Sequence, residues 1–127
     1  MLGIILVGAG SFIGGVCRYL LSTWVYKFLD NPWFPFGTLV VNALGCLVIG
    51  FLAGVAETRS IFTSDVHLFI FIGILGGFTT FSAFALETLL LARGSESLAA
   101  IINIGSQMVL GLLAVWIGNL LAHTWGG

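Results

Sequence analysis

Four long runs without a charged side chain constrain this sequence more than any other feature. The runs are Met1–Cys17, Asn31–Ala56, Val66–Leu86 and Ser97–Gly127. A helix needs about 20 apolar residues to cross the ~30 Å hydrocarbon core of a bilayer, and each run supplies most or all of that length. Only 7% of the residues are charged, against about a quarter in a typical soluble domain. The chain therefore lacks the polar groups to cover a water-exposed surface, and we expect a membrane protein.

The connectors divide the sequence into four expected helices of a single all-α transmembrane domain, which covers residues 1–127. These connectors are short and carry both prolines and most of the acidic residues. The expected helices are Leu2–Phe28, Gly37–Ala56, Val66–Ala92 and Ser97–Ala122. Each is long enough to span a membrane, and no length remains for a second domain.

Positive charges give the chain almost no preferred orientation in the membrane. Lys and Arg on short loops favour the cytoplasmic side. The side that would hold the N-terminus, the 57–65 loop and the C-terminus offers only Arg59, whereas the opposite side offers Lys27 and Arg93. Either other features fix the orientation, or the chain inserts both ways round, in which case an antiparallel homodimer follows.

Regular spacings of glycine favour close helix association. Each spacing lets another backbone approach, although that backbone can belong to the same chain. The first two helices do not resemble the last two, so an inverted repeat would need a second copy of the molecule. The spacings are Gly10-x-x-x-Gly14, Gly50-x-x-x-Gly54 and Gly73-x-x-x-Gly77.

The stretch GGFTTFSAF at 76–84 stands near the middle of the third expected helix. Glycine costs a helix interior roughly 1 kcal/mol relative to alanine, and the hydroxyls of Thr79, Thr80 and Ser82 can compete for backbone hydrogen bonds. Backbone groups freed at membrane depth need protein, water or an ion as a partner. The stretch is therefore either an intact, closely packed glycine-rich helix or a helix broken near 76–80 that lines an ion site.

Aromatic and amide side chains around this stretch are candidates for contact with an anion. Phe81 and Phe84 share a face if helix resumes there, and aromatic ring edges are electropositive. Asn42 offers two N–H donors, and Asn103 and Gln107, four residues apart, form a polar stripe on the last helix. The alternatives are two core phenylalanines and hydrogen bonds that only join helices.

Two charged residues, Arg18 and Glu87, fall inside expected helices away from the helix ends, where such residues usually face a cavity or a partner unless they reach the interface. No metalloprotease, serine-hydrolase, phosphate-loop or Cys/His metal motif is present, so we expect no enzyme. A net charge of −1 without a basic cluster predicts no nucleic-acid partner. A channel, a transporter or a structural membrane subunit remains.

Three stretches together resemble the Fluc family of fluoride channels, the CrcB-like proteins. They are GGFTTFSAF leading to Glu87, FGTLVVN ending at Asn42, and a GxxxGxxxR spacing that ends at Arg18. The resemblance covers nearly the whole chain and is looser in the last helix. Ala83 and Ala85 stand where family members often carry hydroxyl residues, so these two positions contribute nothing to a polar track.

The resemblance implies a fluoride-selective channel in the inner cell membrane, built as an antiparallel, dual-topology homodimer with two pores that passively export fluoride and lower its cytoplasmic concentration. It implies a structural Na⁺ at the dimer centre, held by the backbone carbonyls of Gly76 and Thr79. Arg18, Thr38 and Glu87 are implied as supporting positions. The pore residues expected on these grounds are Asn42, Thr80, Phe81, Ser82, Phe84, Asn103 and Gln107.

Two other functions compete with a fluoride channel. A proton-coupled small multidrug transporter also has four helices and dual topology, but that class needs a central carboxylate in the first helix, where this chain has Arg18 and no acid. A non-transporting scaffold subunit would tolerate apolar replacements of Asn42 and Asn103 together.

Overall fold

The structure, a computed structural model, describes residues 1–30 and 32–125. Within them, four helical segments are long and apolar enough to cross a membrane. This confirms the expected all-α architecture with four spans. The largest difference from the expected helix ends lies in the second span, which continues past Ala56 to Arg59. The spans are Leu2–Phe28, Phe36–Arg59, Ser64–Arg93 and Ser97–Thr124.

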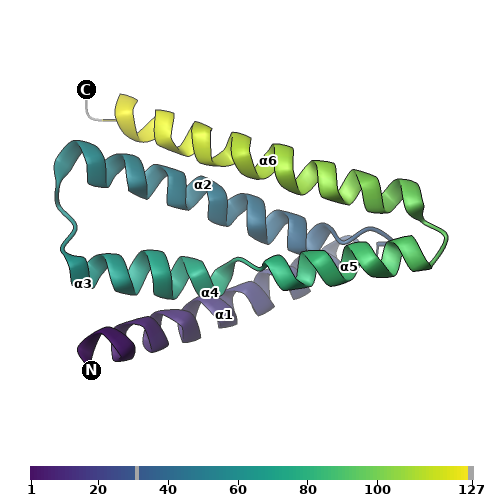
Figure 1. The fold of residues 1–127 in the computed structure, drawn as a ribbon, viewed down its shortest axis with the longest axis horizontal. Coiled ribbons are helices and arrows are strands. Elements are labelled where there is room, and N and C mark those ends of the chain that lie inside the picture. Colours follow the sequence, from purple (N-terminus) through teal and green to yellow (C-terminus); the bar gives the residue numbers. More distant parts are fainter. Residues whose placement is uncertain (31, 126–127) are drawn as a thin grey trace.

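The first, second and fourth spans are single helices, α1 (Leu2–Phe28), α2 (Phe36–Arg59) and α6 (Ser97–Thr124), whereas the third span consists of several segments. Figure 1 shows the N-terminus, the α2–α3 connection and the C-terminal end of α6 at one end of the bundle, and the α5–α6 connection at the other. In order, the third span contains α3 (Ser64–His67), the π-helix η1 (Leu68–Leu75), α4 (Gly76–Phe78) and α5 (Phe81–Arg93).

Glycines bring α2 and α6 into backbone contact. A Cβ at Gly50 would overlap the carbonyl oxygen of Val115, and a Cβ at Gly118 would overlap that of Leu47. At Gly54 a Cβ would lie 2.6 Å from the Cβ of Ala122. Larger residues at these positions would separate the two helices, so glycine sets their distance.

The first span packs against the third in the same way. A Cβ at Gly10 would lie 2.8 Å from the Cα of Gly73, one at Gly14 would overlap the carbonyl oxygen of Ile74, and one at Gly77 would lie 2.8 Å from the carbonyl oxygen of Ser11. The three glycine spacings found in the sequence thus all pack helices within one chain.

Most apolar side chains remain on the outside of this bundle. Between 11% and 28% of the residues in the most apolar window of each span are buried. Burying so few residues would leave a soluble protein with a large apolar surface, whereas in a bilayer the exterior contacts lipid tails or another protein. The chain is therefore a multi-pass membrane protein.

Replacement of Gly14 by alanine tests the α1–third-span contact. We expect Gly14→Ala to reduce the free energy of unfolding in mixed detergent–SDS micelles by about 1–3 kcal/mol, the usual cost of overpacking, because its Cβ would overlap the main chain at Ile74. The neighbouring Gly15→Ala is the matched control, since nothing lies within 4 Å of a Cβ there. Equal stabilities of the two variants would contradict this packing.

Candidate functional site

Two residues with extended backbone, Thr79 and Thr80, separate α4 from α5. Their φ/ψ angles are −84°/157° and −147°/121°. The chain leaves helical geometry after Phe78, the residue that follows the two glycines, and the Thr80 hydroxyl caps the next helix by accepting a hydrogen bond from the Ala83 N–H at 3.2 Å. A capped start lets α5 begin anew within the same span.

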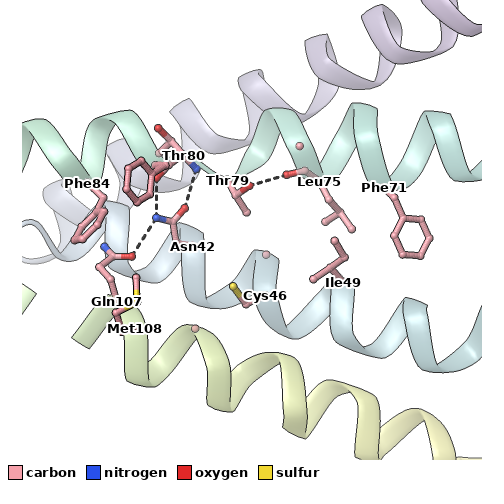
Figure 2. A pocket seen from close by; sticks show the side chains of 14 residues that line it. Asn42, Cys46, Ile49, Phe71, Leu75, Thr79, Thr80, Phe84, Gln107 and Met108 are labelled. Atoms are coloured by element: carbon pink, nitrogen blue, oxygen red, sulfur yellow. Dashed lines mark hydrogen bonds between the residues drawn. The ribbon is translucent and has the colours of Figure 1, made fainter. Parts of the chain in front are cut away.

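Asn42 of α2 replaces the backbone partners that this extended link lacks. The Thr80 N–H, which would point to the Gly76 oxygen in a continuous α-helix, instead donates to Asn42 Oδ1 at 2.8 Å. Asn42 Nδ2 donates to the Thr80 carbonyl oxygen at 2.9 Å and to Gln107 Oε1 of α6 at 3.1 Å. A single amide thus joins three spans (Figure 2).

A cavity of about 350 Å³ opens beside this amide, between α2, the third span and α6. Its surface is mostly apolar, and its polar groups gather around Asn42. Among the expected site residues it brings together Asn42, Gly76, Thr79, Thr80, Phe81, Phe84 and Gln107. The sequence had placed these residues on three different helices without showing that they share one cavity.

The two phenylalanines of α5 flank the cavity in different environments. Their ring centroids are 5.4 Å apart with the planes at 68°, an edge-to-face arrangement. Phe84 is 7% exposed and Phe81 is 73% exposed. Both rings line the cavity. The buried ring of Phe84 is held by packing, whereas the ring of Phe81 lies on the surface of the single chain.

The expected polar stripe of α6 divides into two parts. Gln107 lines the cavity and accepts from Asn42. Asn103, one turn earlier, is 0% exposed and donates through Nδ2 to Thr88 Oγ1 at 2.9 Å. It does not line the cavity, and its contact joins α6 to α5. The two side chains therefore do not share one surface, because Asn103 turns toward the neighbouring helix.

The remaining expected residues surround the cavity at a distance. Arg18 of α1 donates through Nε to the carbonyl oxygen of Gly77 at 3.2 Å, which satisfies a backbone acceptor at the end of α4. Thr38 donates to Glu87 Oε1 at 2.5 Å and ties α2 to α5. Ser82 lies outside the cavity, with its hydroxyl 3.4 Å from that of Thr80. Over residues 1–30 and 32–125, no three His, Cys, Asp or Glu side chains cluster for a metal.

Seven further residues line the cavity that sequence reasoning did not single out: Gly45, Cys46, Ile49, Phe71, Leu75, Met108 and Gly111. Cys46 lies one helical turn after Asn42, so helical spacing could have identified it, whereas Met108 directly follows Gln107 and adjacent helical positions do not share a face. No sequence signal places Phe71, because it lies on the π-helix, whose winding changes which side chains share a face.

Comparison with known proteins adds an independent observation. The family described as "CrcB-like protein, Camphor Resistance (CrcB)" matches residues 5–119. The Fluoride-specific ion channel FluC of Methylobacillus flagellatus is 43% identical over 118 residues, which are 93% of this chain and 92% of that protein. Fluoride-specific ion channel FluC 1 of Rhodopseudomonas palustris is 45% identical over 92% of this chain and 84% of its own length. The FluC of Parabacteroides distasonis is 40% identical, covering 95% and 93%.

Amide exchange at Thr80 tests the role assigned to Asn42. In Asn42→Ala the Thr80 N–H loses its acceptor, so its hydrogen exchange, followed by NMR in detergent micelles, should accelerate by roughly tenfold, as expected for one backbone hydrogen bond. Asn119→Ala is the control, because Asn119 contacts Gly50 far from this link. Unchanged exchange at Thr80 in Asn42→Ala would show that the side chain does not hold the link.

Proposed function

The chain belongs to the CrcB-like protein family, and on that premise we propose that it is a fluoride-selective channel through which fluoride leaves the cell passively. The family is one of channels rather than enzymes, as the absence of catalytic motifs predicted. The named relatives give no support to a multidrug transporter or a scaffold subunit. Export across the inner cell membrane would lower cytoplasmic fluoride.

The observation that carries this proposal is the cavity in which amides meet aromatic ring edges. Fluoride holds its hydration shell tightly, so a pore has to replace that water with donors at close range and still release the ion. The rings of Phe81 and Phe84 can turn electropositive edges toward an anion, and Gln107 offers amide N–H groups beside them. The mostly apolar wall adds no charge that would hold the anion too firmly.

A second copy of the chain completes the site in this proposal. Phe81 is 73% exposed and the cavity opens to the outside of the bundle, so in a single chain both would contact lipid. A partner copy that covers this face would enclose the pore, and the two-fold relation would generate two equivalent pores. The small difference in positive charge, Arg59 against Lys27 and Arg93, supports an antiparallel arrangement of the two copies.

Sodium would stabilise the centre of that dimer. The Thr80 N–H donates to Asn42, so the Gly76 carbonyl oxygen lacks the partner that a continuous helix would give it. Unwound backbone carbonyls of this kind coordinate Na⁺ in membrane proteins. Two copies would each contribute the oxygens of Gly76 and Thr79.

The supporting residues hold the geometry of α4 and α5. The bond of Arg18 to the Gly77 oxygen fixes the end of α4 next to the proposed sodium site. The bond between Thr38 and Glu87, three residues after Phe84, holds α5 against α2. In this proposal both contacts act by positioning the rings and carbonyls.

Fluoride efflux from liposomes tests the proposed function. Liposomes that contain the purified protein should release fluoride, whereas protein-free liposomes should not. Phe81→Ile removes an aromatic edge and should slow efflux by roughly three- to tenfold, the range expected for one aromatic contact, while the dimer persists in size-exclusion chromatography. The matched control is Phe12→Ile, an equally exposed ring (72%) on α1 that does not line the cavity. Efflux no faster than in protein-free liposomes would refute the proposal.

Thiol labelling tests the dual topology. A cysteine added after Gly127, in a variant that carries Cys17→Ser and Cys46→Ser, should react with a membrane-impermeant maleimide in about half of the chains in intact cells, because the charge difference between the two sides is small. Two lysines introduced at Ser60 and Ser64 should shift the labelled fraction strongly to one side. Complete labelling, or none, before that change would contradict the antiparallel dimer.

A further inference from the structure

A second cavity, of about 260 Å³, lies at the end of the bundle opposite the two chain termini. The end of α1, the connector between α1 and α2, and the end of α5 with the turn that follows it all contribute to its lining. We propose that this cavity binds a primary ammonium group, and that the head group of phosphatidylethanolamine supplies it. The inference goes beyond fluoride conduction and does not rest on it.

Glu87 gives the first indication of a positively charged ligand. Its Oε1 accepts the hydrogen bond from the Thr38 hydroxyl. Its other oxygen, Oε2, is buried and has no hydrogen-bond partner over residues 1–30 and 32–125. A buried carboxylate oxygen without a donor is costly. Because Glu87 lines the cavity, a ligand there can provide the missing donor.

The chain supplies a second carboxylate to the cavity and no positive side chain. Glu96, in the turn between α5 and α6, also lines it, and among its described lining residues there is no Lys, Arg or His. Within residues 1–30 and 32–125, neither Glu87 nor Glu96 forms a salt bridge. Charges of one sign along a cavity raise the local concentration of ions of the other sign, so this cavity attracts cations.

Three aromatic rings favour an organic cation over a hydrated one. The cavity is lined by Tyr26, Trp33 and Phe34. Phe34 is 4% exposed and meets the ring of Trp33 edge to face, with the centroids 5.5 Å apart. The ring of Tyr26 lies against Gly37, where a Cβ would overlap it. Rings that packing holds in place in this way commonly bind ammonium groups through cation–π contacts.

A metal ion fits this cavity less well than an ammonium group does. Ca²⁺ takes about six to eight oxygen ligands, whereas the side chains here offer two carboxylates, and no three His, Cys, Asp or Glu side chains cluster within residues 1–30 and 32–125. A primary ammonium group has three N–H donors on a carbon chain. It can donate to Glu87 Oε2 while its methylene groups contact the rings.

The place of the cavity in the bundle favours a lipid as the source of this group. The cavity lies at the ends of helices, and its exposed ring, that of Trp33 (69%), is of the type enriched at membrane–water boundaries. Leu90 and Leu91 add an apolar wall, and Leu90 is 55% exposed. Phosphatidylethanolamine carries its ammonium group at the depth of the head groups and its acyl chains beside the apolar exterior of the helices.

Native mass spectrometry of the purified protein tests this proposal. Micelles contain phosphatidylethanolamine and phosphatidylcholine in equal amounts and with identical acyl chains; the choline nitrogen carries three methyl groups and no N–H. We expect the wild type to retain the ethanolamine lipid over the choline lipid by about tenfold or more, as hydrogen bonds between charged groups imply.

Glu87→Gln keeps the oxygen that accepts from Thr38 but places an NH₂ group where Oε2 stood, so the preference for the ethanolamine lipid should disappear. The matched control is Glu57→Gln, which removes a carboxylate at the opposite end of the bundle, 3.8 Å from His123, and should keep the preference. Trp33→Leu is a second variant that does not depend on the Thr38 contact, and it should lower the preference roughly threefold. Its control is Trp116→Leu, a 60% exposed ring on α6 outside this cavity.

Free amines distinguish the ammonium group from the lipid that carries it. Excess ethanolamine should displace phosphatidylethanolamine from the wild type, whereas excess choline should not. Equal retention of the two lipids by the wild type would overturn the lipid as the source of the ammonium group, and no competition by ethanolamine would overturn the ammonium site. A preference unchanged in Trp33→Leu and, where it folds, in Glu87→Gln would overturn the assignment to this cavity. None of these results depends on whether the chain conducts fluoride.

Discussion

The structure depends on one constraint: a backbone amide in the hydrocarbon core must find a partner inside the protein. The third span leaves helical geometry at Thr79 and Thr80, and water cannot satisfy the freed groups at that depth. A side chain from another span does so, because Asn42 accepts from the Thr80 N–H and donates to its carbonyl. The Asn42 carboxamide thus pairs with the N–H and the carbonyl oxygen of an extended residue, as the backbone of a neighbouring strand would in a β-sheet. It also links the extended segment to α6 through Gln107, so the residues that stabilise the main chain are those that shape the cavity.

Close contacts at glycines between the helices help to bring these polar side chains within hydrogen-bond distance. Backbone contacts of α2 with α6 at Gly50 and Gly118, and of α1 with the third span at Gly14, hold the four spans at short distances. Such close packing lets short polar side chains such as Asn42 reach a neighbouring helix. The cavity lies between α2, the third span and α6, and Phe84 and Gln107 are among the side chains that line it.

The sequence predicted the helices well and the site only in part, for a physical reason. Uncharged runs follow from the thickness of the bilayer, so the four spans could be located to within a few residues. Asn42, Phe81, Phe84 and Gln107 were identified as polar or aromatic groups at depth. The hydrogen bonds that these side chains make depend on a contact between Asn42 and Thr80, which are 38 residues apart in the sequence. The spacing of residues within one helix cannot predict a contact between two different spans. Asn103 is a second example. It lies one turn of α6 before Gln107, yet it makes a buried hydrogen bond to Thr88 of α5, whereas Gln107 lines the cavity.

The π-helix η1 has a consequence for how this chain tolerates insertions and deletions. A π-turn holds more residues than an α-turn, so a segment such as Leu68–Leu75 contains residues that ordinary helical winding would not accommodate. Loss of one residue there could be absorbed by a return to α-helical winding. The glycine pair at 76–77 and the residues after it would then largely keep their orientation relative to α1, whereas loss of one residue from an α-helical segment would rotate everything downstream by about 100°. The π-helix is therefore the part of the third span that best accommodates a change of one residue in its length.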